Sequence, residues 1–321
     1  MKLQSMGNGN AAKLQRWGYF FVLPFILVYA LFHLYPTFYT FFLAFMRDEG
    51  AGIRPVFVFA GLDNFARLVQ DTQFWAALRN TFIIWGFNFI PQIGLALLLS
   101  IWLSDIRLNL KLRGLFRAIV YMPNLLAAAS VALLFRSLLG YPVGPINQIL
   151  ISLGLHDGDG INFLRSVPFT RGTVAFIQFW MWYGHTLILL MAGITSISST
   201  YFEAAKIDGA NSVQTTWRIT LPLLRPIMLF ILVTSAIGGM QMFEVPFLLT
   251  DAQGGPDFSI RTNMVYMFNI GFRGVNDLAY AAAISVGIFI ITLILAVIIF
   301  FFLQDRSDLK RRNFGEKKGA N

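Results

Sequence analysis

The chain has 321 residues, of which 56% are hydrophobic and only 13% are charged. Soluble globular domains contain about 25% charged residues, so this composition excludes an ordinary soluble protein. Cysteine is absent and there are only three histidines. Disulfides, iron–sulfur clusters and thiolate zinc sites are therefore excluded, and we expect no metal site. The formal net charge of +9 could point to nucleic acid, but its meaning depends on where the charges lie.

Six segments are apolar enough, and long enough, to cross about 30 Å of hydrocarbon as helices. They are residues 17–46, 80–103, 118–135, 172–197, 226–250 and 278–304. Five prolines lie inside these segments and are expected to kink the helices rather than break them: Pro24, Pro36, Pro91, Pro123 and Pro246. The first segment is too long for a signal peptide, so we expect it to be retained. The sequence thus predicts an all-α membrane protein with six transmembrane helices.

The predicted spans organise the chain as one membrane domain, residues 17–304, between an N-terminal tail, 1–16, and a basic C-terminal tail, 305–321. Three longer connections, 47–79, 140–171 and 251–277, join the spans on one side. In the first connection, Leu62, Phe65, Leu68 and Val69 have a helical spacing. This pattern predicts a short amphipathic helix at the membrane surface before the second span.

The distribution of charge predicts the orientation of the spans. Sixteen lysines and arginines fall on the side that holds both termini, against eight on the opposite side, and the net charges of the two sides are +10 and −1. Basic residues concentrate in cytoplasmic loops, so both termini are expected to be cytoplasmic. Membrane topology then explains the basic charge, no nucleic-acid partner is expected, and the C-terminal tail is expected to contact anionic lipid.

The sequence contains no obvious means of driving transport or catalysing a reaction. It has no G-x-x-x-x-G-K-[ST] phosphate loop, no dinucleotide fingerprint and no clustered nucleophile, base or metal ligands, so we expect no catalytic residue. Glu244 is the only acidic residue within a span, whereas a proton-driven carrier needs several buried ionisable residues. The chain therefore resembles half of a translocation pore that takes its energy from another subunit. The alternatives are a stand-alone secondary carrier or channel for a small polar solute, and a membrane enzyme.

The segment between spans four and five, residues 199–222, has the pattern of two short helices. Thr200 and Glu203 have the spacing of a capping box, so the first helix is predicted to begin at Thr200 and to stop at Asp208-Gly209. The second is predicted to run from Asn211 and to end before Pro222, with Val213, Trp217 and Leu221 on one face. Such a knob could be a rigid coupling element or an ordinary connection between helices.

The same segment carries a specific sequence motif. Its residues are Glu203, Ala204, Ala205, Asp208, Gly209, Ala210, Ile219, Leu221, Pro222 and Pro226. The motif resembles the E-A-A-x-x-D-G-A…I-x-L-P-x-x-x-P loop of the permease subunits of bacterial ABC importers, and most of all the maltose and glycerol-3-phosphate type of sugar permease. Residues 61–65, 80–81, 114–117 with Pro123, and 254–256 also match that family.

The resemblance implies a type I ABC importer permease fold, in the bacterial inner membrane, that imports a sugar or oligosaccharide by alternating access. It also implies that this chain is not an enzyme and holds no cofactor, because ATP and Mg would bind two partner ATP-binding subunits. Further partners would be a second permease, expected to form a heterodimer with this chain, and an extracytoplasmic solute-binding protein. The residues expected to contact the ATPase are Glu203, Ala204, Ala205, Asp208, Gly209, Ala210, Leu221 and Pro222.

Candidate substrate-binding residues lie within the spans. Gln178, Trp182 and His185 share one face of span four, and sugars suit a face that combines hydrogen-bonding groups with an aromatic plane. The alternative is a packing stripe that bonds across helices. The resemblance favours substrate contact, because corresponding spans line the sugar cavity in maltose-type permeases. The full candidate set is Asn124, Gln178, Trp182, His185, Gln241 and Glu244.

Three further questions stay open in the sequence. Asn88 and Gln92 in span two could complete the lining of the cavity or only hold helices together. Glu244 could contact substrate or have a structural role at an outer gate. Arg136, near the outer end of span three, could pair with Glu244 or extend to the membrane surface.

Overall fold

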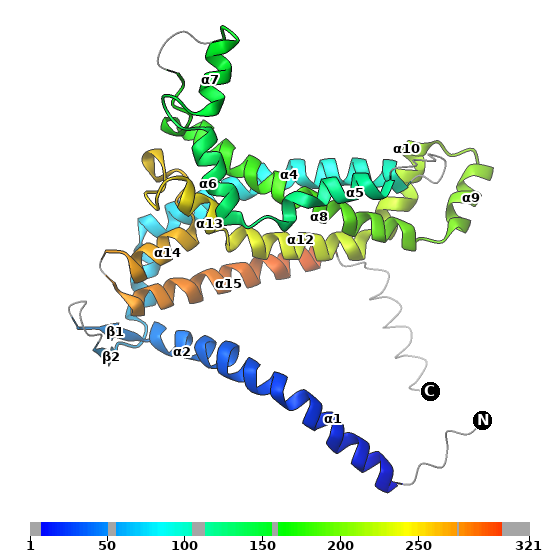
Figure 1. Cartoon of the computed structure of the whole chain (residues 1–321). Coiled ribbons are helices and arrows are strands. Elements are labelled where there is room, and N and C mark those ends of the chain that lie inside the picture. Colours follow the sequence, from blue (N-terminus) through cyan, green and yellow to red (C-terminus); the bar gives the residue numbers. More distant parts are fainter. Residues whose placement is uncertain (1–7, 51–55, 105–112, 156–159, 275, 304–321) are drawn as a thin grey trace. The chain divides into compact units, whose positions relative to one another are not determined.

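The computed structural model describes residues 8–50, 56–104, 113–155, 160–274 and 276–303 (Figure 1). The predicted C-terminal tail, 305–321, lies outside the described residues. The chain divides into two units, residues 1–70 with 270–287, and residues 71–269 with 288–321. Among the described residues, five helices are long and apolar enough to span a membrane, and a bent pair of helices makes a sixth candidate. Five of the six predicted spans are therefore confirmed as candidate spans, with bounds that differ by a few residues except that the second starts at Thr72 rather than at residue 80, and predicted span three corresponds to the bent pair.

The first span belongs to the first unit. It comprises α1 (Asn8–Tyr29), a π-helical turn (Ala30–Leu34) and α2 (Tyr35–Ala44). Proline lacks an N–H, and its ring crowds the carbonyl one turn earlier. At Pro36 the widened π turn accommodates that conflict without ending the helix, so the expectation that this proline does not break the span is confirmed. The apolar side chains from Trp17 to Leu34 are mostly exposed, as in a helix that faces lipid or a partner.

A small cap completes the first unit. Strands β1 (Met46–Asp48) and β2 (Phe57–Phe59) pair antiparallel, and α3 (Asp63–Gln70) follows. The buried Asn64 amide donates to the carbonyls of Ala44 and Met46, at 3.0 and 2.6 Å. Arg67 pairs with Asp277 at 2.8 Å and lies over the Tyr280 ring, which fastens α3 to the start of α15 (Leu278–Leu303). The predicted short helix is confirmed and its place at the membrane surface stays a prediction, whereas the β-hairpin was not predicted.

Three long helices form the frame of the second unit. These helices, which run side by side, are α4 (Thr72–Ser104), α8 (Val167–Ser196) and α12 (Arg225–Met240) (Figure 1). α5 (Arg113–Tyr121) packs closely on α8 at Gly184, where an added Cβ would lie 2.1 Å from the Val120 carbonyl oxygen. Gly184 thus permits backbone-to-backbone contact between two spans. Small residues at helix interfaces serve this purpose in membrane proteins.

Span three is broken rather than kinked. α5 leads into a 3-10 turn (Met122–Leu125), and α6 (Ala128–Leu138) then departs at 88°. The prediction that Pro123 would only kink this span is therefore wrong. Pro123 cannot donate a helical hydrogen bond, and Leu126 and Ala127 then adopt extended backbone angles that no helix can contain. The break turns α6, the second half of the span, onto α13 (Glu244–Leu249).

Span five is interrupted for three residues, between Met240 and Glu244. The Pro246 ring would collide with the carbonyl of Met242 in a continuous helix. That carbonyl is free of the helix and accepts a hydrogen bond from the buried Thr262 hydroxyl, at 2.7 Å. Residues Arg225–Leu249 still form one candidate span, so the expectation of a kink is met here.

The second and third of the longer connections contain α7 (Pro145–Ser152), two 3-10 turns (Phe163–Arg165 and Pro256–Phe258) and α14 (Asn263–Phe272). Within the second unit, α7 lies at one end of the α4–α8 pair, and the short helices between α8 and α12 lie at the opposite end (Figure 1). Those are α9 (Ser199–Ile207), α10 (Ser212–Thr215), a π turn (Thr216–Thr220) and α11 (Leu221–Leu223).

A buried polar cluster holds the loop 251–262 against α4 and α8. The Asn80 amide donates to the Phe258 carbonyl at 2.8 Å and accepts from the Arg171 guanidinium at 2.7 Å. Arg171 also donates to the Ser259 carbonyl at 3.0 Å. Asp257 and Phe258 have positive φ, a strained conformation that surrounding contacts must maintain. Asn80 is therefore the residue that joins this strained loop to two spans.

Replacing Asn80 by alanine should loosen the loop 251–262. The change removes the loop's amide donor and leaves a half-buried Arg171 donor without its acceptor, a loss of about 1–3 kcal/mol of local stability. Amide hydrogen exchange on the purified complex should become faster in residues 251–262 and stay the same in residues 199–223. Unchanged protection of the loop would show that other contacts hold it.

Candidate functional site

The segment 198–224, which we call the knob, begins one residue earlier than predicted. Ser198 caps α9, its hydroxyl accepting from the backbone N–H of Thr200 at 3.4 Å and lying 2.7 Å from the Thr200 hydroxyl. The predicted capping box of Thr200 and Glu203 is therefore wrong. Ser198 offers the same capping chemistry with an extended backbone, so the helix starts at Ser199 and Glu203 is left exposed on it.

The end of α9 agrees with the prediction. Gly209 has φ +74, and the N–H groups of Gly209 and Ala210 donate to the carbonyls of Lys206 and Ala205, at 3.2 and 2.9 Å. These two bonds are a Schellman motif, which uses a left-handed residue to satisfy the last carbonyls of a helix. Glycine adopts that conformation without steric cost, so Gly209 sets the angle between the two arms of the knob.

The second arm starts where predicted and ends later. Asn211 and Gln214 form a reciprocal capping box, with bonds of 2.9 and 2.8 Å. The helical turns then continue through the π turn to Leu223, so the prediction of an end before Pro222 is wrong. Pro222 lies in the first turn of α11, where its missing N–H costs less.

The knob presents an accessible surface. Ile207 is 87% exposed and Trp217 is 68% exposed, although both are large apolar side chains in a segment rich in charged and polar residues. Of the predicted coupling residues, Glu203, Ala204, Asp208, Gly209 and Pro222 are exposed, Ala210 and Leu221 are half-buried, and Ala205 is buried. Large exposed apolar side chains on a compact projection are typical of a protein–protein contact.

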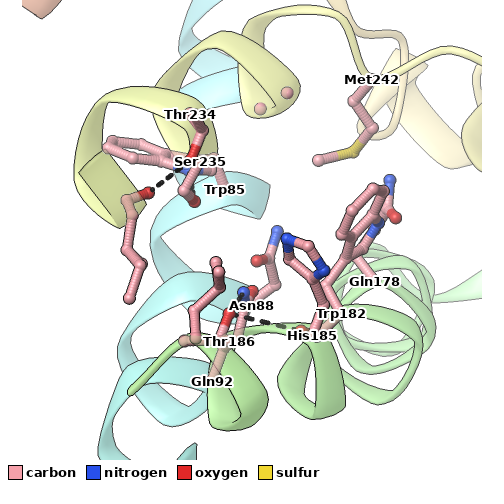
Figure 2. A pocket seen from close by; sticks show the side chains of 14 residues that line it. Trp85, Asn88, Gln92, Gln178, Trp182, His185, Thr186, Thr234, Ser235 and Met242 are labelled. Atoms are coloured by element: carbon pink, nitrogen blue, oxygen red, sulfur yellow. Dashed lines mark hydrogen bonds between the residues drawn. The ribbon is translucent and has the colours of Figure 1, made fainter. Parts of the chain in front are cut away.

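A cavity of about 140 Å³ lies between the three long helices of the second unit (Figure 2). Its lining comes from α4, α8 and α12 and from Met242 just after α12. The lining residues are Trp85, Asn88, Gln92, Gln178, Trp182, His185, Thr186, Leu189, Ile231, Thr234, Ser235, Gly238, Gly239 and Met242. None of them is an acidic residue, a lysine or an arginine.

Span four contributes the face that the sequence predicted. Gln178, Trp182 and His185 all line the cavity, and the rings of Trp182 and His185 meet edge to face with centroids 5.9 Å apart. Their side chains are grouped on one side of the cavity in Figure 2. Trp182 is half exposed, so its ring is available to a ligand in the cavity.

Span two supplies a second polar face. Asn88 and Gln92 line the cavity although both are buried, and the Gln92 amide donates to the Thr186 hydroxyl of α8 at 2.8 Å. The two roles considered for Gln92 are therefore both present, because it lines the cavity and also forms a hydrogen bond between helices. Trp85, one turn before Asn88, completes this face.

The remaining predicted residues lie elsewhere. Asn124 is in the 3-10 turn of span three, where its amide donates to the Met181 carbonyl at 3.4 Å. Gln241 and Glu244 flank the interruption of span five and are exposed, while Met242 between them lines the cavity. Their role in binding stays a prediction.

Arg136 does not pair with Glu244 in the structure. Its guanidinium makes a two-point ion pair with the carboxylate of Asp251, just beyond α13. The 88° turn of span three carries Arg136 to the loop after α13, so that Asp251 rather than Glu244 becomes its partner.

The fold, the broken spans and the knob define an importer permease. Residues 96–313 match the family of binding-protein-dependent transport system inner membrane components, and the chain belongs to that family. The predicted type I importer fold is confirmed by a crystal structure of a bacterial ABC transporter involved in the import of the acidic polysaccharide alginate. A chain of that transporter is 25% identical, with a TM-score of 0.76 over 92% of this chain and 97% of the other.

Named relatives agree with this assignment. The lactose transport system permease protein of Rhizobium radiobacter is 30% identical over 94% of this chain and all of its own length. The arabinooligosaccharides transport system permease protein of Bacillus subtilis is 31% identical over 87% of this chain and 86% of its own. The resemblance found in the sequence motif is therefore confirmed over nearly the whole chain.

Proposed function

We propose that this permease conducts a neutral sugar or oligosaccharide into the cell through the cavity between α4, α8 and α12. The observation that carries the proposal is the composition of that cavity, in which amide, imidazole and hydroxyl groups alternate with two indole rings. Sugars present hydroxyls to polar partners and flat C–H faces to aromatic rings. The names of the relatives, which refer to lactose and arabinooligosaccharides, support the same class of substrate.

The knob would connect this cavity to an energy source. We propose that it docks on one of two partner ATP-binding subunits, which hold ATP and Mg, so that this chain itself is not catalytic. The exposed Ile207 and Trp217 would be covered in that contact. Closure of the ATPase pair would then move this chain against a second permease and switch the cavity between the two sides of the membrane.

The proposed orientation puts the knob and both termini in the cytoplasm of a bacterial cell. It rests on the excess of lysine and arginine on that side. The α7 end of the second unit would then face outward, where an extracytoplasmic solute-binding protein would deliver the sugar. A solved complex of the alginate transporter with a pentasaccharide-bound periplasmic protein supports this arrangement for a permease of the same fold.

Reconstitution tests the proposal against a stand-alone carrier. The chain, purified with its partner permease and ATPase in vesicles, should take up radiolabelled lactose, maltose or arabinobiose only with ATP and a loaded binding protein. Co-purification with an ATP-binding protein is expected. Uptake that persists without the ATPase would overturn the proposal and favour a secondary carrier.

Single substitutions test the cavity. Gln178→Ala and Trp182→Ala should each lower uptake about fivefold or more, because each removes roughly 1 kcal/mol of contact with the sugar. Both complexes should assemble normally. Leu98→Ala, at an exposed position on α4 outside the cavity lining, is the control. Unchanged uptake in both cavity variants would reject the cavity as the sugar path.

A further inference from the structure

The position of one tryptophan in the cavity, Trp85, depends on a glycine in the neighbouring helix α12. Trp85 extends from α4 toward α12, and its indole N–H donates to the Ser235 hydroxyl at 3.1 Å (Figure 2). The ring also contacts Gly239, one turn further along α12. A Cβ on Gly239 would lie 2.3 Å from Cδ1 and 2.7 Å from Cγ of the indole. The ring therefore lies directly against the backbone of α12.

This close contact leaves the indole little freedom. The hydrogen bond to Ser235 fixes one edge of the ring, and contact with Gly239 fixes the ring against the helix. Phe89, the next residue on that face of α4, stacks on the same ring with centroids 5.2 Å apart. A ring held on three sides can offer its remaining surface to a ligand without losing conformational entropy when the ligand binds.

We infer that Trp85 is a specificity-determining residue, a fixed stacking surface for one neutral sugar ring, and that Gly239 and Ser235 are its positioning residues. The inference rests on the proposed function. Trp85 and Trp182 border the cavity on two sides, from α4 and α8 (Figure 2). The amides of Asn88 and Gln92 lie along the same cavity and can bond the hydroxyls at the rim of a ring.

Two properties of the cavity restrict the ligand to an uncharged ring. An indole face attracts the flat C–H surface of a cyclic sugar, which an open-chain polyol with the same hydroxyl groups lacks. The cavity also has no lysine or arginine in its lining, so a carboxylate or phosphate would enter without a charged partner. Cyclic neutral sugars should therefore bind better than sugar alcohols or uronates of equal size.

Saturation-transfer NMR on the detergent-solubilised full complex tests this inference without the binding protein. The probes are lactose, maltose and arabinobiose, each against a sugar alcohol and a uronate disaccharide. Wild-type complex should transfer saturation to ring C–H protons of at least one neutral sugar, and at least fivefold less to the open-chain sugar alcohol glucitol and to the uronate disaccharide. Trp85→Ala should reduce that signal at least fivefold, and Trp85→Phe should retain most of it.

The positioning residues are tested by adding a single methyl group. Gly239→Ala should displace the indole and reduce the signal as strongly as Trp85→Ala, whereas Gly86→Ala, whose Cβ would meet no atom within 4 Å, should change nothing. Combining Gly239→Ala with Trp85→Ala should reduce the signal no further than either change alone, because no indole is left to displace. A purely structural role for Gly239 would instead make the two losses add.

The possible outcomes separate this inference from the proposed function. If wild-type complex takes up no saccharide with ATP and binding protein, the proposed function fails. If uptake and NMR signal are present but Trp85→Ala binds sugar as well as wild type, only the role of Trp85 is overturned. Equal signals from lactose and from glucitol, an open-chain sugar alcohol without any ring, would also overturn it.

Discussion

Gly184→Ala is expected to prevent the permease from reaching a stable fold. The new Cβ would lie 2.1 Å from the Val120 carbonyl oxygen and 2.8 Å from its carbon. These are backbone atoms of α5, so no side-chain rotation can relieve the collision. Overpacking costs about 1–3 kcal/mol where side chains can adjust, and we expect at least the upper end of that range here. Yield and thermal unfolding of the purified complex provide the measurement.

The matched control is Gly172→Ala in the same helix. Its Cβ would meet no atom within 4 Å, and alanine favours helix over glycine, so stability should be equal or slightly higher. A normal yield and melting temperature for Gly184→Ala would show that α5 and α8 are further apart than the structure places them.

Gly209→Val is expected to uncouple ATP hydrolysis from uptake while leaving the spans intact. Valine is β-branched and is strongly disfavoured at φ +74, at a cost of about 1–3 kcal/mol, so the Schellman motif should open and the angle of the knob should change. Uptake should fall about tenfold or more in reconstituted vesicles. Hydrolysis should continue without stimulation by the loaded binding protein.

Gly209→Asn tests whether the loss of coupling comes from the backbone conformation or from the presence of a side chain. Asparagine tolerates the left-handed conformation better than any other residue except glycine, so this variant should keep most of its coupling. If Val and Asn reduce uptake equally, bulk at an interface, rather than the turn, is what matters. If neither reduces it, the knob does not transmit the ATPase motion.

The six spans were predictable because the membrane imposes a length and a polarity on every helix. The place at which a span is interrupted depends on local backbone conformation, and the sequence shows only where the prolines are. Pro36, Pro91 and Pro123 look alike in the sequence, yet the first is absorbed in a π turn, the second lies within the continuous helix α4, and the third begins an 88° bend. Extended angles at Leu126 and Ala127 make the difference, and nothing in their side chains predicts them.

The cavity was half predictable for a similar reason. Gln178, Trp182 and His185 share a helical face, so periodicity alone grouped them. Thr234 and Ser235 were missed because small hydroxyl residues are common in membrane helices and usually bond to their own backbone, as Thr234 does to the Phe230 carbonyl. Trp85 was missed because its role depends on Gly239 on another helix, and pairing between helices is not visible in a single sequence.

The shape of the knob is maintained by hydrogen bonds of Ser198, Gly209 and Asn211, all of which lie within residues 198–214. A segment shaped by its own short-range bonds does not need another subunit to set the angle between its two arms. We therefore expect the knob to bind the ATP-binding subunit with little loss of conformational entropy. Such a segment should also keep its shape when transplanted between permeases, so that exchanging it would reassign which ATPase a permease accepts.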